Sequence, residues 1–306
     1  MATVDRPAAL ARCLDALLSG SLLPGEIVIV DQGGSDATRA TIAERTNAVV
    51  PLVHIRQERR GLSSSRNLGV SRTKYQVVAI TDDDCVPDRE WVAVIDRTFR
   101  SSNPPDVLTG RILPFGPPID GTYVVSARPA TVRREFSGQL TGKVAPWDVG
   151  SGANVATTRQ CFINVGGCNE RLGTGSPGMA AEDVDLIYRL LRAGLRIRYE
   201  PDALMYHERQ SRHQRITSRY TYGFGIGAFC AMWLRRGDRY PRRVLWNWLK
   251  DQMLALAHAG ARCQWFDMYQ RWLSLRGTLR GVIYGVRFGE PQSLPPQLIT
   301  DKHHPS

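Results

Sequence analysis

Residues 77–84 read Val-Val-Ala-Ile-Thr-Asp-Asp-Asp, an apolar run that ends in three adjacent carboxylates. A short apolar run of this kind is typical of a strand buried on both faces of a parallel sheet. Adjacent carboxylates repel one another and need a countercharge, which a hard cation such as Mg²⁺ or Mn²⁺ supplies while it also binds substrate phosphates. The stretch therefore predicts a metal-assisted phosphate site at a strand end, and the simpler alternative is an acidic turn or helix N-cap.

Two other apolar runs end at a polar residue in the same way. Residues 27–30 precede Asp31, and residues 204–206 precede His207. Short apolar runs that alternate with helix-like segments predict an α/β domain, with a mostly parallel sheet flanked by helices. Because ligands bind such sheets outside the carboxyl ends of the strands, we expect these polar residues to converge on one crevice.

The α/β pattern extends to about residue 207, and the chain beyond it reads as helical. Residues 101–148 are rich in Pro and Gly, which predicts loops and an excursion from the sheet. Apolar and polar residues at helical spacing follow later in the chain, at Leu245, Trp248, Leu249, Gln252 and Leu256. We therefore place a domain boundary between residues 1–207 and a helical C-terminal appendage, residues 208–306.

The net charge of +11 belongs to this C-terminal region, where 16 basic side chains face 6 acidic ones. Five of the seven tryptophans lie in the same region: Trp233, Trp246, Trp248, Trp265 and Trp272. Interleaved basic and aromatic residues suit an anionic membrane surface or nucleic acid, and the ordinary alternative is a solvated arginine-rich helix face. The longest uncharged stretch, residues 220–234, is shorter than the roughly 20 apolar residues of a spanning helix, so we expect no transmembrane helix.

The six cysteines form no CxxC pair, and the sequence opens without a secretory leader. This usage favours buried thiols in a reducing cytoplasm over a disulfide scaffold.

Six short motifs occur in a fixed order along the first 200 residues. They are residues 30–36 (VDQGGSD), 61–69 (GLSSSRNLG), 82–84 (DDD), 150–154 (GSGAN), 166–170 (GGCNE) and 182–186 (EDVDL). In this order the chain resembles glycosyltransferase family 2, whose members have the GT-A fold. The resemblance covers nearly all of residues 1–210, and it implies that residues 1–207 form a GT-A catalytic domain that takes a nucleotide diphosphate sugar as donor.

The resemblance also implies which residues contact the donor. Asp31 would accept hydrogen bonds from the base or ribose, and Arg66 with Asn67 would lie near the nucleotide. Asp82 resembles the first residue of the family's DxD motif, nearer the ribose, and Asp83 is included in the nucleotide-sugar site.

The resemblance further implies a metal site and a sugar pocket. Asp84, with Asp82 and His207, would hold a divalent cation, Mg²⁺ or Mn²⁺, although a lone histidine is more often structural. Gly152, Ala153 and Asn154 would line the pocket for the donor sugar and the acceptor, and a simple turn is the alternative.

Glu182 and Asp183 open a segment with the apolar periodicity of a helix, residues 184–192, followed by Gly194. A helix N-terminus favours an ionised carboxylate, which suits a base that takes a proton from an attacking hydroxyl. Capping alone also explains acidic residues here. In the context of the resemblance we favour Asp183 as the base, with Glu182 as the competing candidate.

Three features depart from the family pattern. Residues 1–7 do not show the pattern of the usual first strand, so we expect that strand to be missing or truncated. Gln32 replaces a commoner Asp, and no QxxRW pattern occurs. The last absence favours transfer of a single sugar over processive synthesis.

We therefore expect an inverting, metal-dependent glycosyltransferase of cell-surface glycan or glycolipid synthesis, with a glycan or lipid-linked acceptor. The C-terminal region would attach it to the inner face of an anionic membrane, and no nucleic acid is expected as its partner. Two alternatives are a catalytically degenerate nucleotide-sugar binder and a basic membrane-binding or nucleic-acid-binding protein. The acidic triplet and residues 182–183 favour the enzyme.

Overall fold

A parallel three-stranded sheet forms the N-terminal part of the fold in the computed structural model, which describes residues 1–46, 49–58, 61–138 and 144–288. Its strands run in the order β1 (Ala2–Thr3), β2 (Ile27–Asp31), β3 (Leu52–Arg56). Helices α1 (Pro7–Leu18) and α2 (Asp36–Ala43) pack against it through apolar side chains such as Leu10 and Ile42, which contact the β2 side chain of Ile29 in one core. The apolar run before Asp31 is therefore a buried strand, as its composition predicted.

A second, larger sheet runs in the order β4-β9-β6-β10-β5, with β8 beside β10. Its strands are β4 (Val77–Ile80), β5 (Cys85–Pro87), β6 (Val107–Pro114), β8 (Arg134–Ser137), β9 (Val155–Thr158) and β10 (Arg196–His207). Strands β6 and β10 are parallel, whereas β9 is antiparallel to both of its neighbours, β4 and β6. The α/β class is confirmed, and the sheet is mixed rather than mostly parallel because β9 enters it in the reverse direction.

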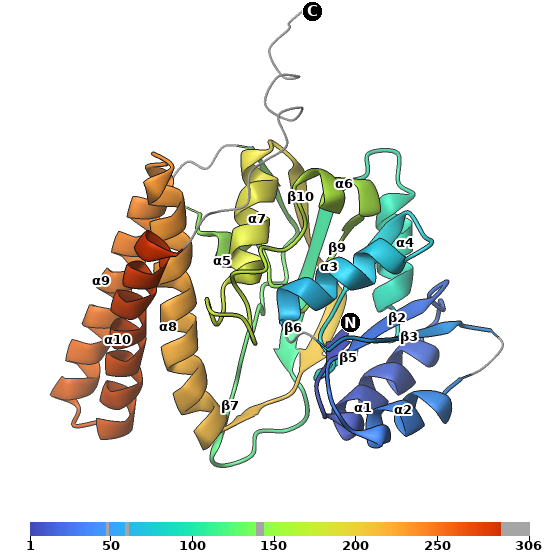
Figure 1. Cartoon of the computed structure of the whole chain (residues 1–306), viewed down its shortest axis with the longest axis horizontal. Coiled ribbons are helices and arrows are strands. Elements are labelled where there is room, and N and C mark those ends of the chain that lie inside the picture. The colour runs from blue at the N-terminus through green and yellow to red at the C-terminus, as the bar shows by residue number, and fades with distance from the viewer. Residues whose placement is uncertain (47–48, 59–60, 139–143, 289–306) are drawn as a thin grey trace, which may run out of the picture.

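Helices cover both faces of the larger sheet (Figure 1). They are α3 (Leu62–Arg72), α4 (Trp91–Phe99), α5 (Pro146–Val149), α6 (Arg159–Asn164) and α7 (Glu182–Arg192). On one face, Trp91 and Ile95 of α4 join the core of α1. On the other face, Phe162 of α6 and Leu190 of α7 pack together. The helix predicted after Glu182 is thus confirmed, with its apolar stripe turned towards the sheet.

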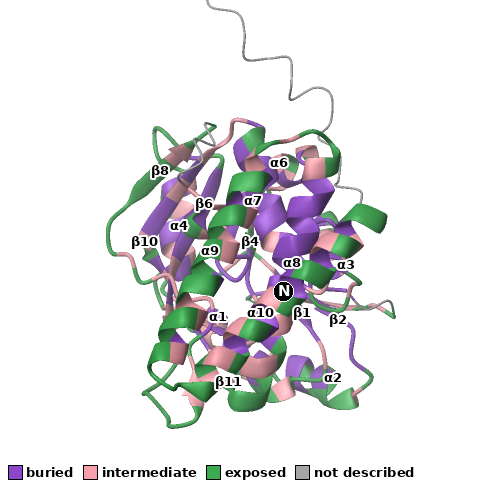
Figure 2. Cartoon of the chain, turned by 90° about the vertical axis from the view of Figure 1, so that its left-hand side faces the viewer, coloured by how far each residue is buried: buried purple, intermediate pink, exposed green. Residues whose placement is uncertain are grey.

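Three long helices form the C-terminal region beside this body: α8 (Arg212–Arg235), α9 (Tyr240–Ala261) and α10 (Trp265–Arg287). Glycines allow α8 and α10 to approach closely, since a Cβ placed on Gly281 would overlap the carbonyl of Phe224. Figure 2 shows α8 largely buried and α9 with an exposed face. Within the described residues, no helix combines the length and apolar character that crossing a membrane requires.

Two strands lie where the sequence indicated little or no strand. The first strand was expected to be missing or truncated, and the structure has a two-residue strand there, since Ala2 and Thr3 pair with β2 while the N-terminal amine donates to the carbonyl of Val28. Residues 107–114 were expected in a loop region but form β6, a central strand. Pro104 and Pro105 precede the strand and Pro114 ends it, whereas Gly110 lies inside it, where the Ala203 carbonyl and the Asn154 side chain leave no room for a Cβ. The glycine therefore marks a close approach within the sheet and does not prevent the strand. Strand β7 (Thr122–Tyr123), which comes after β6 in the chain, pairs with β11 (Gln210–Ser211), which comes after β10, in a two-stranded ribbon.

Candidate active site

A cavity of about 710 Å³ lies between the α/β body and α8. The segment after β4, the start of α7 and the end of β10 all contribute to its wall, so residues far apart in the sequence converge there as expected. Of the predicted site residues, the wall contains Arg66, Asp82, Asp84, Gly152, Ala153, Glu182, Asp183 and His207. This convergence makes the cavity the candidate active site.

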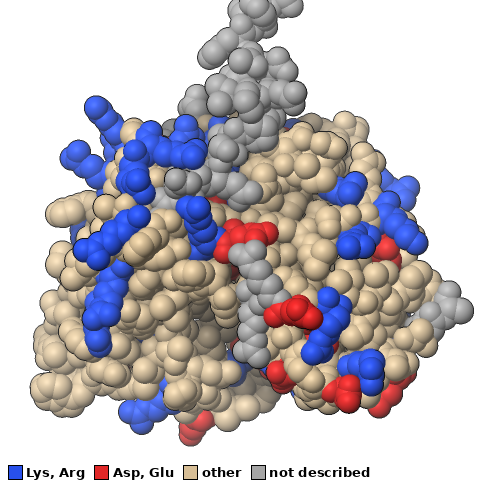
Figure 3. Space-filling view, viewed as in Figure 1, with Lys and Arg blue, Asp and Glu red and all other residues tan. Residues whose placement is uncertain are grey.

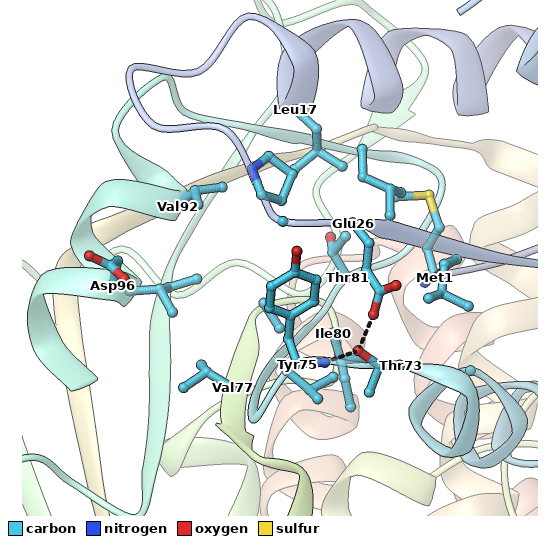
Figure 4. Close-up of a pocket in the computed structure, with 18 of the residues that line it drawn as sticks. Met1, Leu17, Glu26, Thr73, Tyr75, Val77, Ile80, Thr81, Val92 and Asp96 are labelled. Atoms are coloured by element: carbon cyan, nitrogen blue, oxygen red, sulfur yellow. Dashed lines mark hydrogen bonds between the residues drawn. The ribbon is translucent and has the colours of Figure 1, made fainter. Parts of the chain in front are cut away.

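A second cavity, of about 640 Å³, lies between β2, β4 and α4 (Figure 4). Its wall is mainly apolar, with the Tyr75 ring standing inside and a hydrogen bond of 2.6 Å from the Thr73 hydroxyl to Glu26 at its edge. Of the predicted site residues it contacts only Arg66. The predicted site residues thus gather at the first cavity rather than here.

Arginines neutralise the acidic triplet from two sides. The Arg66 guanidinium donates to Asp82 at 2.7 Å, and Arg6 pairs with both Asp83 and Asp84. Burial opposes ionisation of Asp82, but the charge and hydrogen bond of Arg66 outweigh it and lower the Asp82 pKa. The repulsion among the three carboxylates is thus relieved within the protein, so the countercharge argument alone does not require a metal ion.

The residues beside Asp84 nevertheless fit a divalent cation. Asp84, Cys85 and His207 offer ligand atoms that lie within 4.8 Å of one another, and the Asp84 oxygen is 3.7 Å from His207 Nε2. Ligands of an octahedral Mg²⁺ or Mn²⁺ stand about 3 to 4 Å apart when each bond is about 2.1 Å. Burial raises the Cys85 pKa well above its usual value, so this thiol stays protonated, and a hard cation prefers the oxygen and nitrogen atoms.

The hydrogen bond at the other nitrogen of His207 supports this fit. Nδ1 lies 3.0 Å from the carbonyl oxygen of Glu208. Because a carbonyl only accepts, Nδ1 carries the proton, and in the neutral ring the Nε2 lone pair faces the Asp84 carboxylate. The Nε2 lone pair and the carboxylate repel each other, and a cation between the two groups removes this repulsion. Asp82, the third predicted ligand, is occupied by Arg66 and lies outside this group.

Arg66 connects the acidic triplet with the start of α7. Its side chain is buried and donates to Glu182 at 3.0 Å, to Asp82, and to the Gly152 carbonyl at 3.3 Å. Burial and the neighbouring charge of Asp183 raise the Glu182 pKa to about 7, although Arg66 acts in the opposite direction. Glu182 is therefore a buried carboxyl held by an arginine, with little freedom to turn towards a ligand.

Asp183 is fixed differently. One carboxylate oxygen accepts the backbone N–H of Gly152 at 3.0 Å, and the other accepts the N–H of Val184 at 2.8 Å. The residue is half-buried at the N-terminus of α7, on the cavity wall. Backbone donors thus orient the carboxylate and leave lone pairs available on the cavity side, a suitable arrangement for a proton acceptor.

Asp31, expected at the donor, faces the interior instead of the cavity. The Asp31 carboxylate is fully buried, accepts the Gly33 N–H at 2.8 Å and lies near His54 and Arg56. Its neighbour Gln32 lines the cavity in its place.

Asn67 and Asn154 likewise hold the protein together. Asn67 exchanges hydrogen bonds with the backbone of Cys168, and Asn154 bonds Trp91 and the carbonyl of Ala203. Neither these asparagines nor Asp83, which bonds Thr3 and Arg6, belongs to the cavity wall.

The wall also contains polar side chains that sequence reasoning did not single out: Arg6, Arg128, Arg219 and Tyr222. Arg6 precedes α1 by one residue, and Arg219 and Tyr222 share a face of α8. The only sequence signal for the last two was the unusual density of arginine after residue 208. Figure 3 shows Lys and Arg gathered over the C-terminal helices, beside the acidic groups in the middle of the same view.

Comparisons with known proteins agree with this geometry. The model of Glycosyl transferase family 2 matches residues 1–142, and that of Glycosyl transferase family group 2 matches residues 77–284. A pre-mycofactocin glycosyltransferase of Mycobacterium tuberculosis is 26% identical over 206 residues, 66% of this chain and 41% of that protein. A glucosyl-dolichyl phosphate glucuronosyltransferase of Haloferax volcanii is 24% identical over 227 residues, 67% of this chain and 66% of that protein. The chain thus spans less than half of the first relative.

Solved structures share the fold. The mannosyltransferase PcManGT from Pyrobaculum calidifontis, in complex with GDP-Man and Mn²⁺, has a TM-score of 0.64 at 16% identity, with 94% of this chain and 85% of that chain covered. S. aureus TarS 1-349 has a TM-score of 0.54 at 16% identity over 94% and 79% of the two chains. The likeness confirms the expected GT-A architecture.

Proposed function

This chain belongs to glycosyltransferase family 2, and we propose that its cavity binds a nucleotide diphosphate sugar and transfers one sugar to an acceptor hydroxyl with inversion. The observation that carries the proposal is the bridge formed by Arg66. It joins Asp82, beside the candidate cation ligands, to Glu182, beside the candidate base. A donor and an attacking hydroxyl can therefore meet within one cavity.

In the proposed reaction Asp183 accepts the proton of the acceptor hydroxyl. The hydroxyl oxygen forms a bond to the anomeric carbon from the face opposite the diphosphate. The bond from that carbon to the diphosphate oxygen breaks, and its electron pair leaves with the diphosphate. Because the carbon is attacked from behind, its configuration is inverted.

The departing diphosphate needs positive charge nearby. Asp84 and His207 would hold a divalent cation, which neutralises the phosphate oxygens when it is bound. Arg6, half-exposed and paired with Asp84, lies beside the same carboxylate and lines the cavity. It is available to contact an anionic leaving group there. The mannosyltransferase bound to GDP-Man and Mn²⁺ supports this arrangement by its fold.

We further propose that the acceptor is lipid-linked and that α9 and α10 lie against an anionic membrane on the cytoplasmic side. Trp246, Trp265 and Trp272 are exposed on these helices, beside their basic side chains. Tryptophan favours the membrane interface, and each Lys or Arg near it contributes about 1 kcal/mol. Two other tryptophans are excluded from this role, because Trp233 donates to Asp185 and Trp248 to Thr278 inside the protein.

The transfer proposal is tested with paired variants of the candidate base. A panel of GDP- and UDP-sugars with Mn²⁺ first identifies the donor through thermal stabilisation of the folded chain. Asp183→Asn should then bind the donor normally but lose transfer, on the order of a hundredfold or more. Glu182→Gln is the matched control and should retain most transfer. If Glu182→Gln is inactive and Asp183→Asn is active, the base is Glu182, and if no nucleotide sugar binds the wild type, the proposal fails.

A further inference from the structure

Among the described residues, the cavity wall on α8 carries an arginine without an ion-pair partner. Arg219 lines the cavity, and its buried Nε has no hydrogen-bond acceptor in the described part of the chain. Burial and the like charges of Arg215 and Arg271 lower the Arg219 pKa to about 10. A cation so placed is destabilised by desolvation and repulsion together.

The two neighbouring arginines are bound by neutral groups only. Arg215 donates from Nε to Gln270 at 2.8 Å, and Arg271 donates to Gln252 at 3.3 Å. No carboxylate lies within ion-pair distance of these two side chains or of Arg219 among the residues that the structure describes. Within the described residues, no ion pair therefore neutralises the positive charge of the cluster, although Asp267 acts on Arg215 from beyond ion-pair distance.

Arg128 lines the same cavity from the loop that precedes β8. Burial lowers the Arg128 pKa, and the charge of Asp183 is the largest effect that opposes this. Among the described residues its buried Nε has no acceptor, and its one side-chain bond goes to the adjacent carbonyl of Ala127. Arg128 thus adds to the wall that contains the proposed base a second guanidinium group that has no ion pair within the described residues.

Tyr222 connects the basic wall with Asp183. It follows Arg219 by three residues on α8 and lines the cavity. Burial and the charge of Asp183 raise its pKa to about 12, whereas Arg219 acts in the opposite direction. Asp183, Tyr222 and Arg219 all line this one cavity, so a ligand that fills it can contact Asp183 and Arg219 together.

The cavity wall thus carries more positive groups than the proposed donor site would use. The candidate cation ligands and Arg6 would meet the donor diphosphate, which leaves Arg128 and Arg219, on the same wall as Asp183, for another anionic group. Guanidinium groups bind phosphate through paired N–H donors, and several of them suit a multiply charged group.

We propose that the acceptor carries a phosphate group, which Arg219 and Arg128 bind while its hydroxyl lies at Asp183. The inference rests on the proposed transfer at this cavity and adds the chemical class of the acceptor. The phosphate belongs either to a lipid-linked acceptor or to a soluble phosphate ester, since the same guanidinium groups recognise both.

Titration calorimetry on the full chain, saturated with the nucleoside diphosphate and Mn²⁺, tests the proposal with glycerol phosphate as the probe. Wild type should bind it, and Arg219→Gln should bind it at least tenfold more weakly. Arg219→Lys, which keeps the charge but not the paired donors, should fall between them. The control is Arg243→Gln, an exposed residue of α9 outside the cavity wall, which should bind as wild type does.

A second arm identifies the source of the phosphate. Phosphatidylcholine vesicles that contain a polyprenyl phosphate should bind wild type more than Arg219→Gln if the acceptor is a lipid, and soluble glycerol phosphate should then compete poorly. The inference is overturned if Arg219→Gln binds both probes as wild type does, or if it loses nucleoside diphosphate affinity instead. A wild type that binds no nucleoside diphosphate would refute the proposed function itself.

Discussion

Glu182 is the buried carboxyl whose replacement gives the sharpest test of the site electrostatics. Its side chain is 11% exposed and accepts a hydrogen bond from Arg66 at 3.0 Å. The Glu182→Gln variant keeps the shape of the side chain and an acceptor oxygen for Arg66, which also retains Asp82. The substitution therefore removes the ionisable group with little change in packing.

The expected effect on stability follows from the Glu182 pKa, which burial and Asp183 raise from 4.5 to about 7. Between these two pKa values the folded state holds more protons than the unfolded state. Stability from this group is thus fully present below about pH 4.5 and is lost as the pH rises through about 7. At about 1.4 kcal/mol per pKa unit, wild type should lose about 2.5 kcal/mol between about pH 5 and pH 8 that Glu182→Gln does not lose.

Urea unfolding followed by fluorescence at a series of pH values measures this difference. The difference in unfolding free energy between Glu182→Gln and wild type should grow by about 2.5 kcal/mol across that interval. Glu90→Gln removes a carboxylate that is exposed at the start of α4, so its pH dependence should match wild type. Parallel curves for Glu182→Gln and wild type would refute the assigned environment.

Three further outcomes are expected. Asp84→Asn should lose most of its transfer activity and its response to added Mn²⁺, because it removes the carboxylate of the candidate cation site; undiminished wild-type activity in EDTA would contradict this. Gly281→Ala should lower the free energy of unfolding by about 2 kcal/mol or more, since its Cβ overlaps the Phe224 carbonyl, whereas Gly260→Ala, whose nearest neighbour is 3.9 Å away, should be neutral or stabilising. Wild type should sediment with anionic vesicles at low salt and be released as the ionic strength rises, Trp265→Ala should bind them less, and equal failure to bind anionic and neutral vesicles would exclude the membrane role.

The position of the site was predictable from the sequence because it depends on local patterns. Apolar runs followed by polar residues marked the ends of β4 and β10, and the periodicity after Glu182 marked α7. These signals involve neighbours along the chain, so one sequence suffices to read them. The predicted residues close to these strand ends and to this helix start therefore lie in one cavity.

The partners of these residues were not predictable, because they come from distant segments. Arg6 reaches Asp83 across 77 residues, and Arg66 reaches Glu182 across 116. The density of arginine after residue 208 did not single out Arg219, whose proposed role depends on its having no ion-pair partner among the described residues. Asp31 shows the converse: the motif pointed to the donor, but the structure buries its carboxylate among His54 and Arg56.

The exposed strand β4, which lines the apolar cavity, affects how the protein behaves in concentrated solution. Among the described residues β4 pairs only with β9, and its residues Val77 and Ala79 are exposed although both are apolar. An open apolar strand edge is a template for a strand from another molecule. We expect this edge to limit colloidal stability, so that Val77→Lys should reduce light scattering at high protein concentration without weakening nucleotide binding; unchanged scattering would place the limiting contact elsewhere.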